Sequence, residues 1–466
     1  MRANHLIESL VNISQSSKTD FALFMNMSPS GLSKILTGNR LPLQKEKRTF
    51  YQQAAAYFSK ALWAPNCYAK LTDIFPVIYD FSSIQELEQF LIQALKYTLD
   101  IEYAAENNVN LDFPDREECF LGPRLSLNMI CILLSDHINS ASGGPLELYI
   151  NFPLFSDSSP DLLGRLIFAN LSRDCSLSFH CFINSSYMNS DQSVMGFPFL
   201  QTAVKMQEYG DLYFWTANWN NNQPFLLLKG RFLLVFTTLI DGSQTMTMIA
   251  HKSFLASFFT SLMRQGPKRV SFSGAEASAG LQARPDLIDG LIRKGVQAAY
   301  IFMPLGFLLK GEDLDAQHAP DFRRHEAAKL FDHILKSSIP LYITQDMMEH
   351  FYKTGRLILP LAGIVNISRS KRLPYLSRLS AHLGNRDADS VILLNSNMPK
   401  LAILQCREYT VLYVADSRCR NEKFHVLPTE AIQRGLNREL ASGRLSPLPL
   451  DEEMWGTLLQ ELRALG

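Results

Sequence analysis

Residues 18–42 constrain the fold more than any other part of the chain, because they carry the signals for two short helices with a tight turn between them. They read KTDFALFMNMSPSGLSKILTGNRLP. Ser28 followed by Pro29 is typical of a helix start, since a serine hydroxyl caps the first N–H groups and proline has no N–H to satisfy. Gly38 is typical of a helix end, since glycine adopts a left-handed backbone without strain. The segment therefore predicts a helix-turn-helix corner.

The apolar positions of this segment agree with the prediction. They are Phe21, Ala22 and Met25 in a first helix that Ser17 or Thr19 would cap, and Leu32, Ile35 and Leu36 in the second. We expect Ala22 to lie where the two helices cross closely, and Met27 to cover the small core between them. The opposite face of the second helix is slim and polar, which suits entry into a major groove, and consists of Ser30, Gly31, Ser33, Lys34 and Thr37.

Charge separates the amino-terminal segment from the rest of the chain. The whole chain is neutral, with 45 Lys and Arg against 45 Asp and Glu, and 47% of its residues are hydrophobic, which excludes a mostly disordered chain. Residues 1–70 carry nine basic and three acidic side chains, a net +6, so the remainder carries −6. A basic head on a slightly acidic body is typical of a DNA-binding module joined to another domain. The alternative is chance clustering of surface lysines.

Over residues 4–63 the sequence resembles the phage-repressor and Cro-like (XRE-type) family of helix-turn-helix DNA-binding domains. The ungapped matches are Phe21-Ala22, Met27-Ser28, Leu32-Ser33-Lys34-Ile35 and Thr37-Gly38-Asn39-Arg40-Leu41-Pro42. Three positions depart from the family pattern: Lys18 replaces the usual Gln, Asn26 the usual turn Gly, and Leu36 a common acidic residue. The resemblance implies that Lys18 and Arg40 contact the DNA backbone and that Ser30, Ser33, Lys34 and Thr37 face base edges. Ser28 and Asn39 complete the predicted DNA-binding set.

The length of 466 residues predicts two to four domains. Residues 1–66 would form an all-α DNA-binding domain, completed by a helix over 45–63 whose apolar face is Phe50, Ala54, Phe58 and Leu62. Residues 71–140 would form a helical connector, with one helix bearing Leu87, Phe90, Leu91, Ala94 and Leu95 on its apolar face and another over 123–138.

A large α/β body is expected after the connector. The predicted strands are 146–152, 177–184 and 211–216, with helices near 160–170 and 195–208, then a meander over 225–228, 232–239 and 245–249 and a helix over 251–264. Strands 401–404, 410–414 and 424–427 and a helix over 429–440 repeat the meander and its helix at an offset of about 178 residues. One interpretation is a duplicated unit, with related lobes at 145–265 and 268–466. The other is that this order of elements is common.

The sequence contains no recognisable motif for nucleotide binding, catalysis or metal binding. There is no G-x-x-x-x-G-K-[ST] or G-x-G-x-x-G loop and no C-x-x-C pair. A strand over 177–184 would put His180 and Cys181 on opposite faces, so they could not bind one metal ion together. His325 and His333 are two helical turns apart, which is too far for a single zinc ion. We therefore expect no catalytic residues, no metal and no cofactor.

The densest basic patch of the body consists of Arg369, Lys371, Arg372 and Arg378. It would either bind a phosphorylated or carboxylated effector or form part of the solvated surface.

Seven irregularly spaced cysteines favour reduced thiols in a cytoplasmic protein, and no signal peptide or membrane span is expected. The sequence predicts a sequence-specific transcriptional regulator that is not an enzyme. It would bind double-stranded DNA as a homodimer, and its body would dimerise or sense a small-molecule or peptide effector. Two alternatives remain: an enzyme whose active site lies between the lobes, localised by the DNA-binding head, and a protein-interaction adaptor with a degenerate head.

Overall fold

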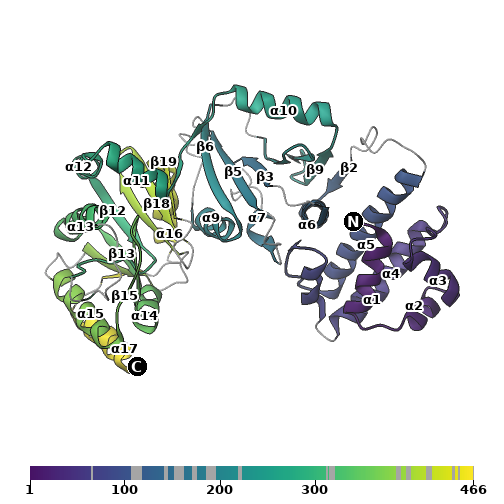
Figure 1. The fold of residues 1–466 in the computed structure, drawn as a ribbon, viewed down its shortest axis with the longest axis horizontal. Coiled ribbons are helices and arrows are strands. Elements are labelled where there is room, and N and C mark those ends of the chain that lie inside the picture. Colours follow the sequence, from purple (N-terminus) through teal and green to yellow (C-terminus); the bar gives the residue numbers. More distant parts are fainter. Residues whose placement is uncertain are drawn as a thin grey trace. The chain divides into compact units, whose positions relative to one another are not determined.

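The computed structural model describes residues 1–64, 67–106, 118–140, 145–151, 162–169, 176–184, 196–218, 223–310, 313, 321–384, 390–394, 400–415, 422–442, 447–449 and 452–464 (Figure 1). The chain divides into two units, and both combine helices with β-sheet. The first unit comprises 1–178 and 221–265, and the second comprises 179–220 and 266–466. The predicted boundary near residue 266 coincides with this division. The predicted lobe 145–265 does not, because residues 179–220 belong to the second unit.

The first unit begins with a cluster of helices. These are α1 (Ala3–Ile13), α2 (Lys18–Phe24), α3 (Pro29–Leu36), α4 (Lys47–Trp63), the 3₁₀ helix η1 (Cys67–Asp73), α5 (Ile84–Glu106) and α6 (Pro123–Ser140). The predicted apolar face of α5 is fully buried, and α5 packs against α1, α4 and α6. The predicted connector 71–140 is therefore not a separate element, because its first long helix shares a core with the amino-terminal helices.

An antiparallel set of strands completes the first unit. Strands β3 (Leu146–Asn151), β7 (Phe225–Leu228), β8 (Phe232–Thr238), β9 (Gln244–Ile249) and β2 (Glu118–Leu121) are hydrogen-bonded in that order, and α10 (Lys252–Arg264) follows β9. A short ladder joins β1 (Val77–Ile78) to β4 (Ile167–Phe168), which follows α7 (Leu162–Arg165). Gly230 and Gly242 have positive φ at the two meander turns. The predicted meander is therefore confirmed.

The second unit has a sheet with a parallel centre. The central strands β12 (Val296–Ile301), β13 (Leu341–Thr344) and β16 (Val391–Leu394) are parallel to one another. On the β12 side the sheet continues with four antiparallel strands, in the order β17 (Leu401–Cys406), β18 (Tyr409–Val414), β19 (Lys423–Pro428) and β11 (Ser271–Ser273). On the other side, β20 (Leu448–Pro449) pairs antiparallel with β16. Its helices are α11 (Gly274–Ala283), α12 (Leu287–Arg293), α13 (Asp321–Lys336), α14 (Gln345–Thr354), α15 (Arg369–Leu383), α16 (Thr429–Ala441) and α17 (Glu452–Ala464), with a hairpin of β14 (Arg356–Leu359) and β15 (Gly363–Asn366). Phe351, Tyr375 and Trp455 are among its largest core side chains.

Residues 179–220 form hydrogen bonds with residues at the start of β11 in the second unit. This segment contains most of β5 (Leu177–Asn184), then α9 (Phe197–Tyr209) and β6 (Asp211–Ala217), with β10 (Lys268–Arg269) antiparallel to β6. The N–H of Val270 donates to the carbonyl of Phe214 at 2.9 Å, and the N–H of Phe214 donates to Ser271 Oγ at 2.6 Å. These bonds join residues that are distant in the sequence, so the sequence pattern placed residues 179–220 in the lobe 145–265 instead.

The two units repeat one order of strands. In the first, β3, β7, β8, β9 and β2 are neighbours in that order; in the second, β12, β17, β18, β19 and β11 are neighbours in the corresponding order, with all pairings antiparallel in both. A helix follows β9 and β19 directly, as α10 and α16. The set β5, β6 and β10 likewise corresponds to β13, β16 and β20. The recurrence extends well beyond the three strands and one helix that the sequence predicts.

Within the part of the chain that the structure describes, no helix combines the length and the apolar character needed to cross a bilayer. Among the cysteines in that part, four have free thiols, namely Cys119, Cys131, Cys181 and Cys406. Cys175 and Cys419 lie outside the described residues.

Candidate nucleic-acid interface

Helix α2 begins and ends with local hydrogen bonds that the sequence dictates. Ser17 Oγ accepts from the N–H groups of Thr19 and Asp20 at 3.2 and 3.4 Å, which makes Ser17 the N-cap. At the other end, Asn26 has φ of 51° while Met27 N–H donates to the carbonyl of Ala22 at 2.9 Å. This is a Schellman stop with asparagine in the left-handed position, which asparagine tolerates better than most residues other than glycine.

Helix α3 has the predicted start and stop. Ser28 Oγ accepts from the N–H of Gly31 at 3.1 Å, and Pro29 occupies the first helical position. Gly38 ends the helix with φ of 73°, and the N–H of Asn39 donates to the carbonyl of Lys34 at 2.9 Å. The sequence therefore predicted both ends of α3 correctly, because both depend on neighbours within four or five residues.

The corner is held against α4 by aromatic packing. Phe21 and Ala22 are fully buried, and the Phe21 ring lies 5.0 Å from that of Tyr57 and 4.7 Å from that of Phe58. The predicted buried face of α4 is confirmed at Phe50, Ala54, Phe58 and Leu62. Since α1 contacts both α3 and α5, the corner rests on a continuous helical core, with α3 at the outer edge of the cluster (Figure 1).

The polar face of α3 is open to solvent. All eight residues of the predicted DNA-binding set are exposed: Lys18, Ser28, Ser30, Ser33, Lys34, Thr37, Asn39 and Arg40. An α-helix with small side chains on its outer face fits the width of a major groove. Seven of the eight residues lie on α3 and the segments that flank it, and Lys18 lies at the start of α2.

Several of these side chains also serve the corner itself. Thr37 Oγ1 donates to the carbonyl of Ser33 and accepts from Asn39 Nδ2, both at 3.0 Å, so these two side chains stabilise the end of α3. Ser28 is the N-cap. Lys18 Nζ lies 3.3 Å from Glu8 Oε1, but both side chains are half exposed, so this ion pair contributes little stability. Ser30, Ser33 and Lys34 form the centre of the exposed face.

Part of the basic charge of the amino-terminal segment is used internally, which the sequence reasoning missed. Lys47 forms an ion pair with Asp100 of α5, and the amino-terminal ammonium of Met1 pairs with Asp136 of α6. Glu102 accepts from the N–H of Ala3 at 3.2 Å, and its pKa is nevertheless raised above the ordinary value, chiefly by burial. Asp100 and Glu102 lie near the end of α5, far along the sequence from the groups that they contact.

Two residues of the predicted effector patch are engaged inside the second unit. Arg372 Nη1 donates to the carbonyls of Tyr352 and Lys353 at 2.7 and 2.9 Å, which caps the end of α14. Arg378 forms an ion pair with Asp313. Two of the four predicted side chains thus make contacts within the second unit, and effector binding by the patch stays a prediction.

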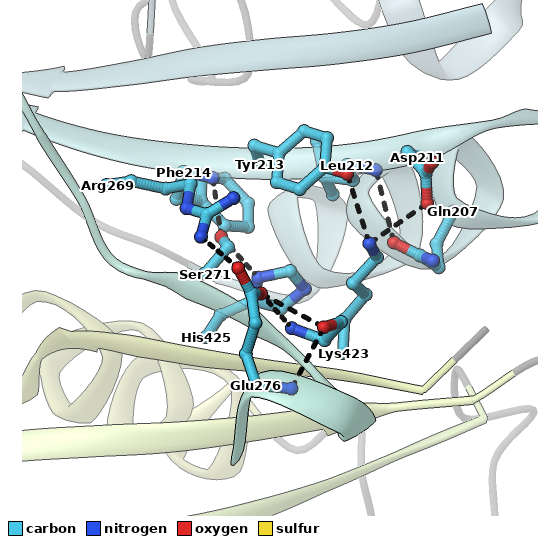
Figure 2. A network of polar contacts seen from close by, with 11 residues as sticks. Gln207, Asp211, Leu212, Tyr213, Phe214, Arg269, Ser271, Glu276, Lys423 and His425 are labelled. Carbon is cyan, nitrogen blue, oxygen red and sulfur yellow. Dashed lines mark hydrogen bonds and ion pairs between the residues drawn. The ribbon is translucent and has the colours of Figure 1, made fainter. Parts of the chain in front are cut away.

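The second unit contains a buried pair of the kind that an enzyme would use. Ser271 Oγ lies 2.7 Å from His425 Nδ1, and the Phe214 ring packs edge-on against the imidazole at 4.9 Å (Figure 2). In an open site, a hydroxyl and an imidazole at this distance could serve as nucleophile and base. Here Ser271 and His425 are both fully buried, and the serine oxygen already accepts from the N–H of Phe214. The pair connects β6, β11 and β19, and neither side chain reaches solvent.

A charged contact lies beside this pair. Lys423 Nζ lies 3.0 Å from Asp211 Oδ1 and 4.5 Å from the centre of the Tyr213 ring, and the lysine side chain is buried (Figure 2). Burial lowers the pKa of His425 to about 3, and the charge of Lys423 acts in the same direction. The imidazole is therefore neutral, and the network is a structural connection between β6 and the second sheet.

No family model and no curated protein matches this chain. Among solved structures it matches TrmBL2, an archaeal chromatin protein whose structure was described as showing a novel mode of DNA binding. The two chains are 11% identical, the match covers 49% of this chain and 94% of the other, and the TM-score is 0.19. A TM-score this low carries no argument about fold or function.

Proposed function

We propose that α2 and α3 form a Cro-like, XRE-type helix-turn-helix and that the chain is a sequence-specific DNA-binding transcriptional regulator. The observation that carries the proposal is the exposed face of α3, capped at both ends, with Ser30, Ser33 and Lys34 at its centre and Arg40 beside it. Lys34 would reach base edges or phosphate, while Lys18 and Arg40 would contact the backbone on either side.

A single recognition helix covers one half-site, so the regulator would act as a homodimer on a two-fold symmetric operator. The remainder of the chain would provide dimer contacts and an effector site. The regulator would act in the cytoplasm. We also propose that this remainder contains a duplicated α/β unit, because the order of five antiparallel strands and a following helix is the same in both units.

Selection of bound genomic fragments by the full-length protein, followed by gel shift, tests the DNA-binding function. We expect a palindromic fragment to bind, and the double variant Lys34→Ala, Arg40→Ala to lose at least about tenfold in affinity, since each lost contact is worth roughly 1–3 kcal/mol. Lys60→Ala is the matched control, because Lys60 is an exposed lysine of α4 in the same helical cluster. Failure of every fragment to bind at low salt would refute the proposal and favour the adaptor alternative.

A further inference from the structure

A pocket opens in the second unit beyond the carboxyl end of β12. Its volume is about 430 Å³, which lies within the range of small-molecule sites. Gly306, Leu308 and Leu309 line it from the segment after β12, and Leu359 lines it from the end of β14. Because β12, β13 and β16 are parallel, the pocket lies where open α/β sheets bind ligands, outside the carboxyl ends of the strands.

The backbone beneath this pocket is fixed in an unusual conformation. The N–H of Gly306 donates to the carbonyl of Ile358 at 3.0 Å, which holds the segment against β14. A Cβ at Gly306 would approach Leu309 and Leu359 side chains to 2.6 and 3.0 Å, so glycine permits this close packing. Leu308 has φ of 51°, a left-handed conformation that is rare for leucine and that occurs preferentially at ligand sites.

Helix α13 supplies the polar side of the pocket. His325, Lys329 and Asp332 follow one another at spacings of four and three residues, so they share one face of the helix, and all three line the pocket. Phe331 adds an apolar surface next to them. The pocket therefore has a charged wall on α13 and an apolar wall formed by Leu308, Leu309 and Leu359.

The charged groups on this wall match a ligand that carries both an amino group and a carboxylate. Lys329 Nζ lies 2.6 Å from Asp289, and Asp332 lies 2.7 Å from Lys336. Glu326, on the same helix, is buried, and its Oε2 has no hydrogen-bond partner among the described residues. Of these charged groups Lys329 and Asp332 line the pocket, so its charged wall offers one ammonium group and one carboxylate.

We propose that this pocket binds an apolar α-amino acid as a zwitterion. Its ammonium group would bind Asp332, its carboxylate would bind Lys329, and its side chain would pack against Leu308, Leu309 and Leu359. Such a ligand matches both walls and leaves the net charge of the site unchanged. The role of this ligand as an effector rests on the proposed regulator function, whereas the binding itself does not.

Calorimetric titration of the full chain, without DNA, tests the site. The probes are L-leucine and L-phenylalanine, with 4-methylvalerate and isopentylamine as leucine analogues that lack the amine and the carboxylate respectively. We expect at least one amino acid to saturate the protein below about 1 mM, a threshold that corresponds to roughly 4 kcal/mol of binding. If L-leucine saturates, each analogue should bind at least tenfold more weakly. Absence of saturation, or equal binding by either analogue, would overturn the proposal.

Variants locate the binding. Lys329→Met and Asp332→Asn should each weaken it at least tenfold, and Ala328→Phe, at an exposed position that lines the pocket, should abolish it by occupying the space. Lys353→Met is the control, since Lys353 forms an equivalent surface pair with Glu349 on α14. Unchanged affinity in folded Lys329→Met, Asp332→Asn and Ala328→Phe would place the ligand elsewhere and refute the site. Gel shift with and without the amino acid then tests regulation separately, so failure of DNA binding cannot be mistaken for failure of this proposal.

Discussion

The ammonium group of Lys47, at the start of α4, is paired with the carboxylate of Asp100 on α5, and the two side chains are only 15% and 10% exposed. The lysine also lies over the Tyr103 ring, 4.8 Å from its centre. Lys47, a basic residue of the amino-terminal segment, therefore connects α4 to α5. The corner that we propose to bind DNA is consequently part of a larger folded body.

Removal of one partner of this pair should destabilise the first unit strongly. Lys47→Ala or Asp100→Ala removes one member of a largely buried ion pair, which costs about 3–5 kcal/mol. Equilibrium urea unfolding should show this loss in each single variant. The double variant should lose less than the sum of the two, and additive losses would contradict a direct interaction. Lys60→Ala, at an exposed site of α4, should change the free energy of unfolding by less than about 0.5 kcal/mol.

The N-cap of α3 should make a smaller, local contribution. Ser28→Ala removes the acceptor for the N–H of Gly31 and should lower the free energy of unfolding by about 1 kcal/mol. Ser28→Asp retains an acceptor there and should recover most of that loss. Ser33→Ala is the control, because Ser33 is an exposed serine within the same helix. An equal loss in Ser28→Ala and Ser33→Ala would show that capping is not what Ser28 contributes.

Salt dependence should separate phosphate contacts from base contacts at the proposed interface. Arg40→Ala should reduce the slope of log K against log salt concentration by about 1, since one phosphate contact is lost. Ser33→Ala should leave the slope unchanged and alter the preference among operator sequences. Fluorescence titrations between about 50 and 200 mM salt measure both effects. A change of slope in Ser33→Ala, with none in Arg40→Ala, would reverse the assigned roles.

The sequence predicted what depends on near neighbours. The ends of α3 at Ser28 and Gly38, the burial of Ala22, and the meander turns at Gly230 and Gly242 are set by hydrogen bonds and backbone angles within a few residues. Those features depend only on residue type and spacing, and both can be taken directly from a single sequence.

Contacts between distant residues were not predictable in the same way. Lys47 counted toward the charge of a DNA-binding surface, yet it pairs with a residue 53 positions away. Arg372 belonged to a patch of basic sequence, yet its guanidinium group caps α14. The hydrogen bond between Phe214 and Ser271 joins residues 179–220 to the rest of the second unit, across 57 positions of the sequence. Composition and local spacing carry no signal for such pairs, because the fold alone brings them together.

His425 should make stability depend on pH. Its ordinary pKa of 6.5 is lowered to about 3 in the folded chain by burial and by Lys423, while Ser271 and Phe214 pack against it. Between those values the unfolded chain binds a proton that the folded chain does not. The free energy of unfolding should therefore fall by up to about 1.4 kcal/mol per pH unit as pH drops below 6.5.

Urea unfolding at intervals between pH 7 and 4 measures this slope. His425→Asn keeps an acceptor for the Ser271 hydroxyl and removes the titrating group, so its stability should fall less steeply on acidification than that of the wild type. His137, whose pKa burial lowers to about 4, adds a similar contribution in the first unit. His137→Asn should therefore reduce the slope independently, and the double variant should show both reductions. If His425→Asn has the same slope as the wild type, the imidazole is not held neutral in the folded state.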